Sequence, residues 1–138
     1  SARSTFLHRT VFVMDKLLSG RRVLVVEDEM LILIMIEDML ADLGCAAVTS
    51  AATVNQAIAL IESQNFDVAM LDMNLNGEMT YLVADALATH GVPFAFSTGY
   101  SSDDIRDGYR DRPVLKKPFM DKELAEVFTH LLRRAALL

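Results

Sequence analysis

Acidic, basic and hydroxyl side chains follow the apolar runs of this sequence at positions where they could do chemistry together. Glu27 and Asp28 follow one such run, Asp72 a second, Thr98 a third and Lys117 a fourth. Carboxylates held close together in a partly desolvated cleft repel one another unless a cation neutralises them. Mg²⁺ is a hard cation that prefers oxygen ligands of this kind. The sequence therefore predicts a magnesium site that includes Glu27, Asp28 and Asp72.

The same residues suit the transfer of a phosphoryl group onto a carboxylate oxygen. In this scheme Asp72 is the nucleophile, while Mg²⁺ and the positive charge of Lys117 hold the phosphoryl oxygens. Thr98 donates a hydrogen bond to the new phosphate, and Asn74 adds its backbone carbonyl to the metal ligands. We therefore expect Mg²⁺ as the cofactor and Asp72 as the reacting group.

Five short apolar strands, separated by segments of helical length, must position these residues. The strands are predicted at residues 23–26, 46–49, 66–71, 93–96 and 114–115. Helices are predicted at 30–43, closed by Gly44, through 57–61, capped by Thr53, through 82–87, and from 120 to about 132 or beyond, with a loop at 74–77. This alternation predicts an α/β fold, a doubly wound sandwich around a five-stranded parallel sheet. Such folds place their chemistry at the carboxyl ends of the strands.

The composition is that of one globular domain and excludes several classes of protein. The chain has 138 residues, 52% of them hydrophobic, and a formal net charge of -6, which argues against nucleic acid as the main partner. Its single cysteine, Cys45, excludes an internal disulfide and a zinc site with several thiolates. The longest apolar run, Met30–Ile36, is far shorter than the ~20 residues that span a bilayer. We expect a cytoplasmic protein without a membrane partner.

Four segments of the sequence resemble a known family, in the right order and on the right elements. They are RRVLVVEDE, VAMLDMNL, FSTGY and VLKKPF, and they resemble the receiver domain of two-component response regulators. The resemblance covers residues 21–138, which we interpret as the receiver domain, and leaves residues 1–20 as an N-terminal extension. It implies the flavodoxin-like receiver fold.

The resemblance also implies a role for each candidate residue. Glu27 and Asp28 match the acidic pair that holds Mg²⁺, and Asp72 matches the phosphoacceptor. Thr98 matches the switch hydroxyl, and Lys117 matches the lysine that precedes a cis Lys-Pro bond. The implied activity is to accept a phosphoryl group from a histidine kinase or a phosphotransfer protein.

A closer likeness is to receivers of alphaproteobacteria. The segment PFAFSTGY is similar to the signature of the FAT GUY receivers, which are mostly single-domain regulators. The segments GRRVLVVEDE, ADALATHGVPFAFSTGY and RDRPVLKKPF are also similar to receivers attached to, or encoded beside, HWE-type histidine kinases. Both interpretations remain open at this point.

Two features depart from the common receiver pattern. Val114 stands three residues before Lys117, where a switch aromatic is common, and the likeness suggests that Tyr100 takes over this switch role beside Thr98. The segment 99–112 has few apolar residues, which is poor material for a helix. We expect the fourth helix to be short, frayed or absent, with an altered output face.

The predicted first helix is apolar on every face from Met30 to Ile36, so something must cover part of it. In one interpretation the chain's own extension forms an extra helix there, because apolar residues recur in it at helical spacing. These are Phe6, Leu7, Val11, Met14, Leu17 and Leu18. In the other, a partner or a second copy of the chain covers the first or the last helix. Met14 is a candidate natural start, in which case residues 1–13 are not native.

The resemblance leads to one main function and to three alternatives. The chain is expected to be phosphorylated on Asp72 and to act by contact with a downstream protein, without enzymatic activity beyond its own phosphorylation and dephosphorylation. One alternative is a receiver module excised from a hybrid HWE-type histidine kinase, and another is a degenerate receiver that only binds a partner. A third is an Mg²⁺-dependent phosphatase with an aspartyl nucleophile, such as the haloacid-dehalogenase group. That group has a second acid where this chain has Asn74.

Overall fold

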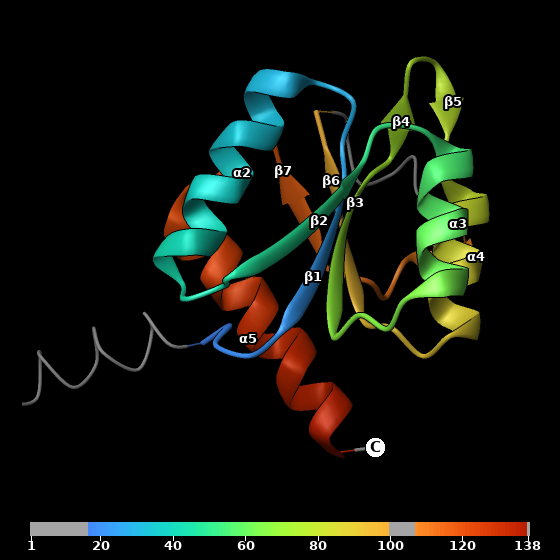
Figure 1. Cartoon of the computed structure of the whole chain (residues 1–138). Helices are drawn as coiled ribbons and strands as arrows, with labels where there is room; N and C mark the ends of the chain where they lie inside the picture. The colour runs from blue at the N-terminus through green and yellow to red at the C-terminus, as the bar shows by residue number, and fades with distance from the viewer. Residues whose placement is uncertain (1–16, 100–106, 138) are drawn as a thin grey trace, which may run out of the picture.

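The computed structural model describes residues 17–99 and 107–137 (Figure 1). The strands are β1 (Arg22–Val26), β2 (Ala47–Ala51), β3 (Val68–Asp72), β4 (Asn74–Leu75), β5 (Glu78–Met79), β6 (Phe94–Thr98) and β7 (Val114–Lys116). The α-helices are α2 (Met30–Asp42), α3 (Val54–Ser63), α4 (Tyr81–Thr89) and α5 (Asp121–Leu137), and a 3-10 helix, η2, spans Asp107–Tyr109. Apart from the two short strands β4 and β5, strands and helices therefore alternate along the described chain, as the hydrophobic pattern predicts.

Five of the strands form one parallel sheet in the order β2-β1-β3-β6-β7. Helices α2 and α5 cover one face of this sheet, and α3 and α4 cover the other (Figure 1). The chain runs from β1 outward to β2, crosses back to β3 on the other side of β1, and then continues to β7. This topology confirms the predicted doubly wound α/β fold.

Two apolar clusters, one on each face, hold the three layers together. Successive strand residues point to opposite faces, so Val23 and Val25 pack toward α2 and α5, while Leu24 and Val26 pack toward α3 and α4. Phe128 of α5 is fully buried in the first cluster. Because the central strands are covered on both faces, they appear in the sequence as unbroken apolar runs rather than alternating ones.

Two predicted helix boundaries have the expected local chemistry. The hydroxyl of Thr53 accepts a hydrogen bond from the backbone N–H of Gln56 at 3.1 Å and so caps α3. Gly44 follows α2 with a φ of 89°, a left-handed conformation that costs glycine little. These boundaries fix where α2 and α3 stop and start relative to the strands.

Several elements extend further than their apolar runs indicate. Backbone pairing continues through polar residues: Asp72 at the end of β3 pairs with Ser97, and Thr98 at the end of β6 pairs with Lys116. Helix α5 continues to Leu137, in agreement with the prediction that it reaches residue 132 or beyond. Asp72 and Thr98 are therefore held on strand ends rather than in loops.

Residues 74–77, predicted as a loop, belong instead to a small antiparallel hairpin formed by β4 and β5. Its two central residues, Asn76 and Gly77, have φ values of 52° and 87°. Positive φ at both positions is the pattern of a type I′ turn, for which Asn-Gly is a preferred sequence. The side chain of Asn74 also accepts a hydrogen bond from the N–H of Gly77 at 2.8 Å.

Some predictions fall on residues outside the described parts. The extra helix over residues 1–16 and the switch role of Tyr100 lie there, as does half of the segment predicted to lack a fourth helix. Within 107–112, the described part of that segment, the only helical element is η2. Leu17 and Leu18 are described and lie in a turn rather than in a helix, with Leu18 fully buried.

Two further observations relate to the composition. Cys45 is a free, buried thiol that donates to the carbonyl of Ala47 at 3.5 Å, and burial raises the pKa of this thiol. Within residues 17–99 and 107–137, none of the helices has the length and apolarity needed to cross a membrane.

Candidate functional site

The carboxyl ends of the parallel strands meet at one edge of the sheet, the upper edge in Figure 1. Glu27 follows β1 directly, Asp72 ends β3, and Thr98 ends β6. Lys117 follows β7, on the other side of β6. The fold therefore brings to one edge four side chains that are up to 90 residues apart in sequence.

Three carboxylates form the acidic part of this site. Glu27, Asp28 and Asp72 each offer one oxygen, and these oxygens lie within 4.8 Å of one another. Glu27 and Asp72 are buried, with 1% and 6% of their surface exposed, while Asp28 is half-buried. Such a group of like charges needs a compensating cation nearby.

Lys117 supplies part of that compensation. Its ammonium donates to Oε2 of Glu27 at 2.9 Å and to Oδ2 of Asp72 at 3.0 Å. Burial alone would lower the pKa of this lysine, but the two carboxylates outweigh it and raise the pKa, so the amine stays charged. Burial also raises the pKa of the Glu27 carboxyl, and the nearby charge of Asp72 adds to this, although the hydrogen bond from Lys117 opposes it.

Backbone N–H groups hold the other carboxylate oxygens in place. The N–H of Asn74 donates to Oδ1 of Asp72 at 3.2 Å, and the N–H of Asn76 donates to Oδ2 of Asp28 at 3.1 Å. The second contact ties the turn of the β4–β5 hairpin to the loop after β1. The hairpin is therefore part of the site's wall, a role that the sequence analysis did not predict.

The carboxylates that the structure brings together suit a divalent cation. All of the side-chain donors are oxygens, and Asp28 is half-buried, which leaves it open to solvent on one side. Lys117 neutralises only part of the negative charge, since it faces two of the three carboxylates. The donor set therefore suits a hard divalent cation such as Mg²⁺ better than a metal that prefers nitrogen or sulfur ligands.

Thr98 is buried at the end of β6, with 1% of its surface exposed. Its backbone carbonyl accepts a hydrogen bond from the N–H of Lys117 at 2.8 Å, so a backbone hydrogen bond links Thr98 directly to Lys117. The adjacent Ser97, which pairs with Asp72 across the sheet, has a buried hydroxyl without a hydrogen-bond partner among the described residues.

An aromatic cluster lies on the same face of β6 as Thr98. Phe94 and Phe96 alternate with Thr98 along the strand, and Tyr109 of η2 packs against both rings at centroid distances of 6.0 Å. Tyr109 also stacks on Tyr81 of α4, and its hydroxyl donates to the carboxylate of Asp85. Tyr109 and Val114 both pack against the buried cluster that contains these rings.

Thr80 is a buried residue of the site that the sequence analysis missed. Its hydroxyl donates to the backbone carbonyl of Asp72 at 2.6 Å, and its N–H donates to the carbonyl of Met73 at 3.1 Å. These two bonds close the hairpin onto the end of β3. The sequence offered little signal for this, because the contact depends on the hairpin that brings Thr80 back to Asp72.

Replacing Thr80 with valine is expected to lower the free energy of unfolding by about 1–2 kcal/mol, because the buried carbonyl of Asp72 loses its partner. Urea denaturation followed by circular dichroism measures this. Thr80→Ser keeps the hydroxyl and is expected to lose less stability. Equal stability of the valine variant and the wild type would mean that the hydroxyl does not hold the end of β3.

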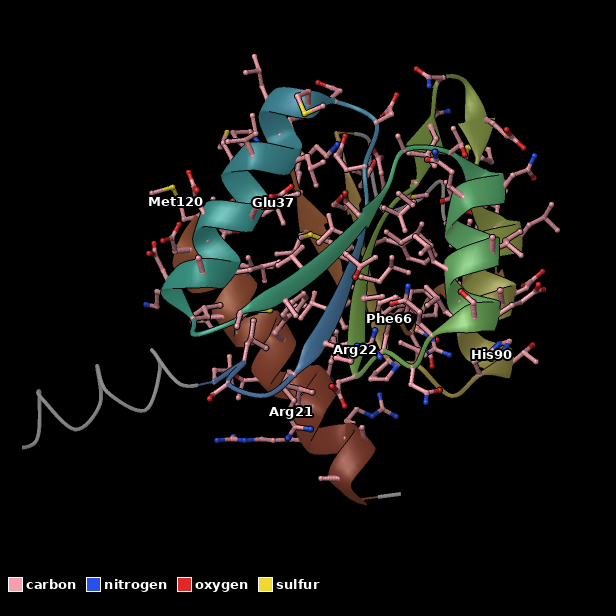
Figure 2. All side chains as sticks on the ribbon, viewed as in Figure 1. Arg21, Arg22, Glu37, Phe66, His90 and Met120 are labelled. Carbon is pink, nitrogen blue, oxygen red and sulfur yellow. The ribbon has the colours of Figure 1, made fainter. Side chains whose placement is uncertain are left out.

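The apolar face of α2 lies beside this site and is exposed. This face, which we call the α2 apolar face, consists of Met30, Leu31, Ile34 and Met35, with exposed fractions of 67%, 79%, 47% and 50%. A groove of about 300 Å³ continues it toward Pro118 and Phe119. Met120, 69% exposed, projects on the same side of the molecule as α2 (Figure 2). Among the described residues, nothing covers Leu31.

Comparisons with known proteins agree with this fold. The family model described as response regulator receiver domain matches residues 23–129. The chain is similar to the solution structure of SdrG from Sphingomonas melonis Fr1, with 44% identity, a TM-score of 0.74, and coverage of 84% of this chain and 98% of that one. The BeF3-activated conformation of SdrG gives 44% identity and a TM-score of 0.71, covering 80% of this chain and 95% of that one.

A more distant likeness is to the receiver domain of the PhyR response regulator from Erythrobacter litoralis. It has 28% identity and a TM-score of 0.71, with coverage of 82% of this chain and 90% of that one. No curated protein matches the chain.

Proposed function

Because this chain belongs to the response regulator receiver family, we propose that it accepts a phosphoryl group on Asp72. The donor is a histidine kinase or a phosphotransfer protein of a two-component system or phosphorelay. The observation that carries this proposal is the position of the Asp72 carboxylate, which ends β3 beside two further carboxylates and 3.0 Å from the ammonium of Lys117.

The chemistry follows from this arrangement. A carboxylate oxygen of Asp72 attacks the phosphorus of the donor, and the new O–P bond forms as the P–N bond of the phosphohistidine breaks. The electron pair of that bond stays on the imidazole nitrogen. Lys117 then faces the phosphoryl oxygens with its fixed positive charge, a role for which its contact with Asp72 positions it.

Mg²⁺ would be held by Glu27, Asp28, Asp72 and the backbone carbonyl of Asn74, and would neutralise charge on the phosphoryl oxygens. Without it, the three carboxylates of the pocket would repel an incoming phosphate. The hairpin donates to Oδ1 of Asp72 and to Oδ2 of Asp28, and Lys117 donates to Oδ2 of Asp72. Each carboxylate oxygen has a second lone pair, so both residues keep acceptor capacity for the ion.

The response to phosphorylation is proposed to run through Thr98 and Tyr100. Thr98 ends the strand next to β3 and would donate to the phosphate, and this would shift the population of conformations of the segment that follows it. The output is contact with a downstream protein in the cytoplasm. The likeness to SdrG, structures of which include a BeF3-activated conformation, supports a single-domain regulator, and the segment PFAFSTGY favours the FAT GUY type. No observation favours the excised kinase module or the phosphatase.

The test is to incubate the protein with acetyl phosphate and Mg²⁺ and to measure its intact mass. A single phosphoryl group is expected, and chelation of Mg²⁺ by EDTA is expected to prevent its incorporation. Absence of a phosphoryl group under both conditions would contradict the proposal. Steady release of phosphate from a generic phosphate ester would favour a phosphatase instead.

The α2 apolar face is the proposed docking surface for the phosphoryl donor. It lies next to the site, and it is too apolar to be an ordinary solvent-facing helix surface. A helix of the kinase or phosphotransfer protein would cover this face during transfer. At other times a second copy of the chain would cover it, so that a homodimer forms through α2 or α5.

Leu31→Glu is expected to slow phosphoryl transfer from the cognate phosphotransfer domain by about tenfold, the equivalent of about 1.4 kcal/mol of docking energy. Labelling by acetyl phosphate, which needs no docking, is expected to stay unchanged. Leu82→Glu is the control, since Leu82 is 62% exposed on α4 on the other side of the sheet. If both variants accept phosphate from the protein donor at the wild-type rate, α2 is not the docking surface.

A further inference from the structure

A second groove, of about 540 Å³, lies at the opposite edge of the sheet from Asp72. It is lined by Pro93 and Pro113, which precede β6 and β7, and by residues of the C-terminal half of α5. In Figure 2 this is the lower edge, where His90 marks the end of α4. The five residues of β6 separate the groove from the site by about 16 Å.

Basic side chains line this groove. Arg112, His130 and Arg134 contribute to it, whereas Asp111 is the only acidic residue among its described lining. In residues 17–99 and 107–137, neither Arg112 nor Arg134 has an ion pair. The chain as a whole carries a net charge of -6, whereas the lining of this groove has two arginines and one aspartate, so the groove is locally basic on an acidic molecule.

Arg112 is the most informative of these residues. Its guanidinium lies 4.7 Å from the centroid of the Phe94 ring, which holds it in a fixed position. Its Nε is buried and has no hydrogen-bond partner among the described residues. A ligand in the groove does not reach this buried atom, but the solvent-facing part of the half-buried guanidinium can donate charge-assisted hydrogen bonds to an anionic ligand.

The floor of the groove is apolar. Val92 and Leu131 are buried, with only 6% and 4% of their surfaces exposed, and the two prolines extend this floor. An apolar floor with a basic rim matches a peptide that carries carboxylates around an aliphatic side chain. It matches a nucleic acid less well, since a sugar-phosphate backbone has no aliphatic side chain to place on the apolar floor.

We propose that this groove binds a short acidic segment of a partner protein, with its carboxylates on Arg112 and Arg134 and an aliphatic side chain on Leu131. This interaction goes beyond the proposed phosphoryl acceptance and does not involve Asp72. It gives the molecule two separate partner surfaces, one at each edge of the sheet.

The test is an NMR titration of the isotope-labelled protein with two blocked peptides, acetyl-EELEE-amide and its neutral counterpart acetyl-QQLQQ-amide. The acidic peptide is expected to shift the amide signals of residues around Pro93, Pro113 and Leu131, and to bind at least tenfold more tightly than the neutral one. Arg134→Gln alone, and together with Arg112→Gln, is expected to weaken binding, by at least tenfold in the double variant.

Arg133→Gln is the matched control, because Arg133 is exposed on the other side of α5 and lines a different groove. It should bind the acidic peptide like the wild type. Asp72→Asn should also bind it like the wild type, so this test stands even if phosphorylation fails.

Three outcomes would overturn the proposal. The first is that millimolar acidic peptide causes no shifts of the amide signals, and the second is that it shifts them as much in the Arg112→Gln, Arg134→Gln double variant as in the wild type. The third is that inorganic phosphate or a short oligonucleotide binds more tightly than the acidic peptide.

Discussion

Replacing Asp72 with asparagine is expected to reduce phosphoryl incorporation from acetyl phosphate to background while the protein stays folded. The amide is neutral and a poor nucleophile, so no O–P bond forms. It has the same shape as the carboxylate, and its oxygen can still accept from Lys117 or from the N–H of Asn74. Intact mass after incubation measures the first effect, and urea denaturation measures the second.

Asp67→Asn is the control for this variant. Asp67 lies just before the start of β3, whereas Asp72 lies at its end. The Asp67 carboxylate accepts a hydrogen bond from the backbone N–H of Arg22 at a distance of 2.7 Å, at the opposite edge of the sheet from Asp72. It is expected to be phosphorylated like the wild type. If Asp72→Asn still gains a phosphoryl group and Asp67→Asn does not, the acceptor has been assigned to the wrong residue.

Replacing Lys117 with methionine is expected to lower the free energy of unfolding by about 3 kcal/mol in buffer with EDTA. Methionine keeps the length of the stem but removes the charge, which leaves the Glu27 side chain, 0% exposed, beside Asp72 without its cation. Removing one partner of a buried ion pair lowers the stability of the fold, because the remaining buried charge is no longer compensated. Urea denaturation in EDTA measures this loss.

Mg²⁺ is expected to restore part of that stability. An ion present at ten times its Kd adds about 1.4 kcal/mol to any state that binds it, and the variant has more uncompensated charge for the ion to neutralise. Lys116→Met is the control, since Lys116 is exposed on β7 and has no ion pair among the described residues. Equal stability of Lys117→Met and Lys116→Met in EDTA would contradict the electrostatic role given to Lys117.

The sequence was sufficient to predict the sheet and the convergence of Glu27, Asp72 and Lys117. Both follow from general rules, because buried parallel strands give unbroken apolar runs and their carboxyl ends share one edge. The predicted strand ends were too early at residues 71 and 96, because backbone pairing does not stop at the first polar side chain.

The contacts that the sequence did not predict depend on tertiary structure. Thr80 reaches Asp72 only because the β4–β5 hairpin folds back, although the Asn76–Gly77 pair was a local signal for that hairpin. Tyr109 lies in a segment with little helical propensity, and its stacking on Tyr81 depends on packing between distant parts of the chain. The same holds for Arg112 on Phe94.

The strand order has a consequence for how the molecule assembles during synthesis. Residues 22–72 contain β1, β2 and β3, which are neighbours in the sheet, together with α2 and α3. The chain leaves the ribosome from its N-terminus, so these three strands are available to associate before β7 has been synthesised. Glu27 and Asp72 then lie side by side at a stage when Lys117, whose ammonium compensates their charge, has not yet been synthesised. We expect the pairing of the three-residue β7 with β6 to complete the sheet last. Lys117 is expected to make this step favourable, because its ammonium then forms hydrogen bonds with the carboxylates of Glu27 and Asp72.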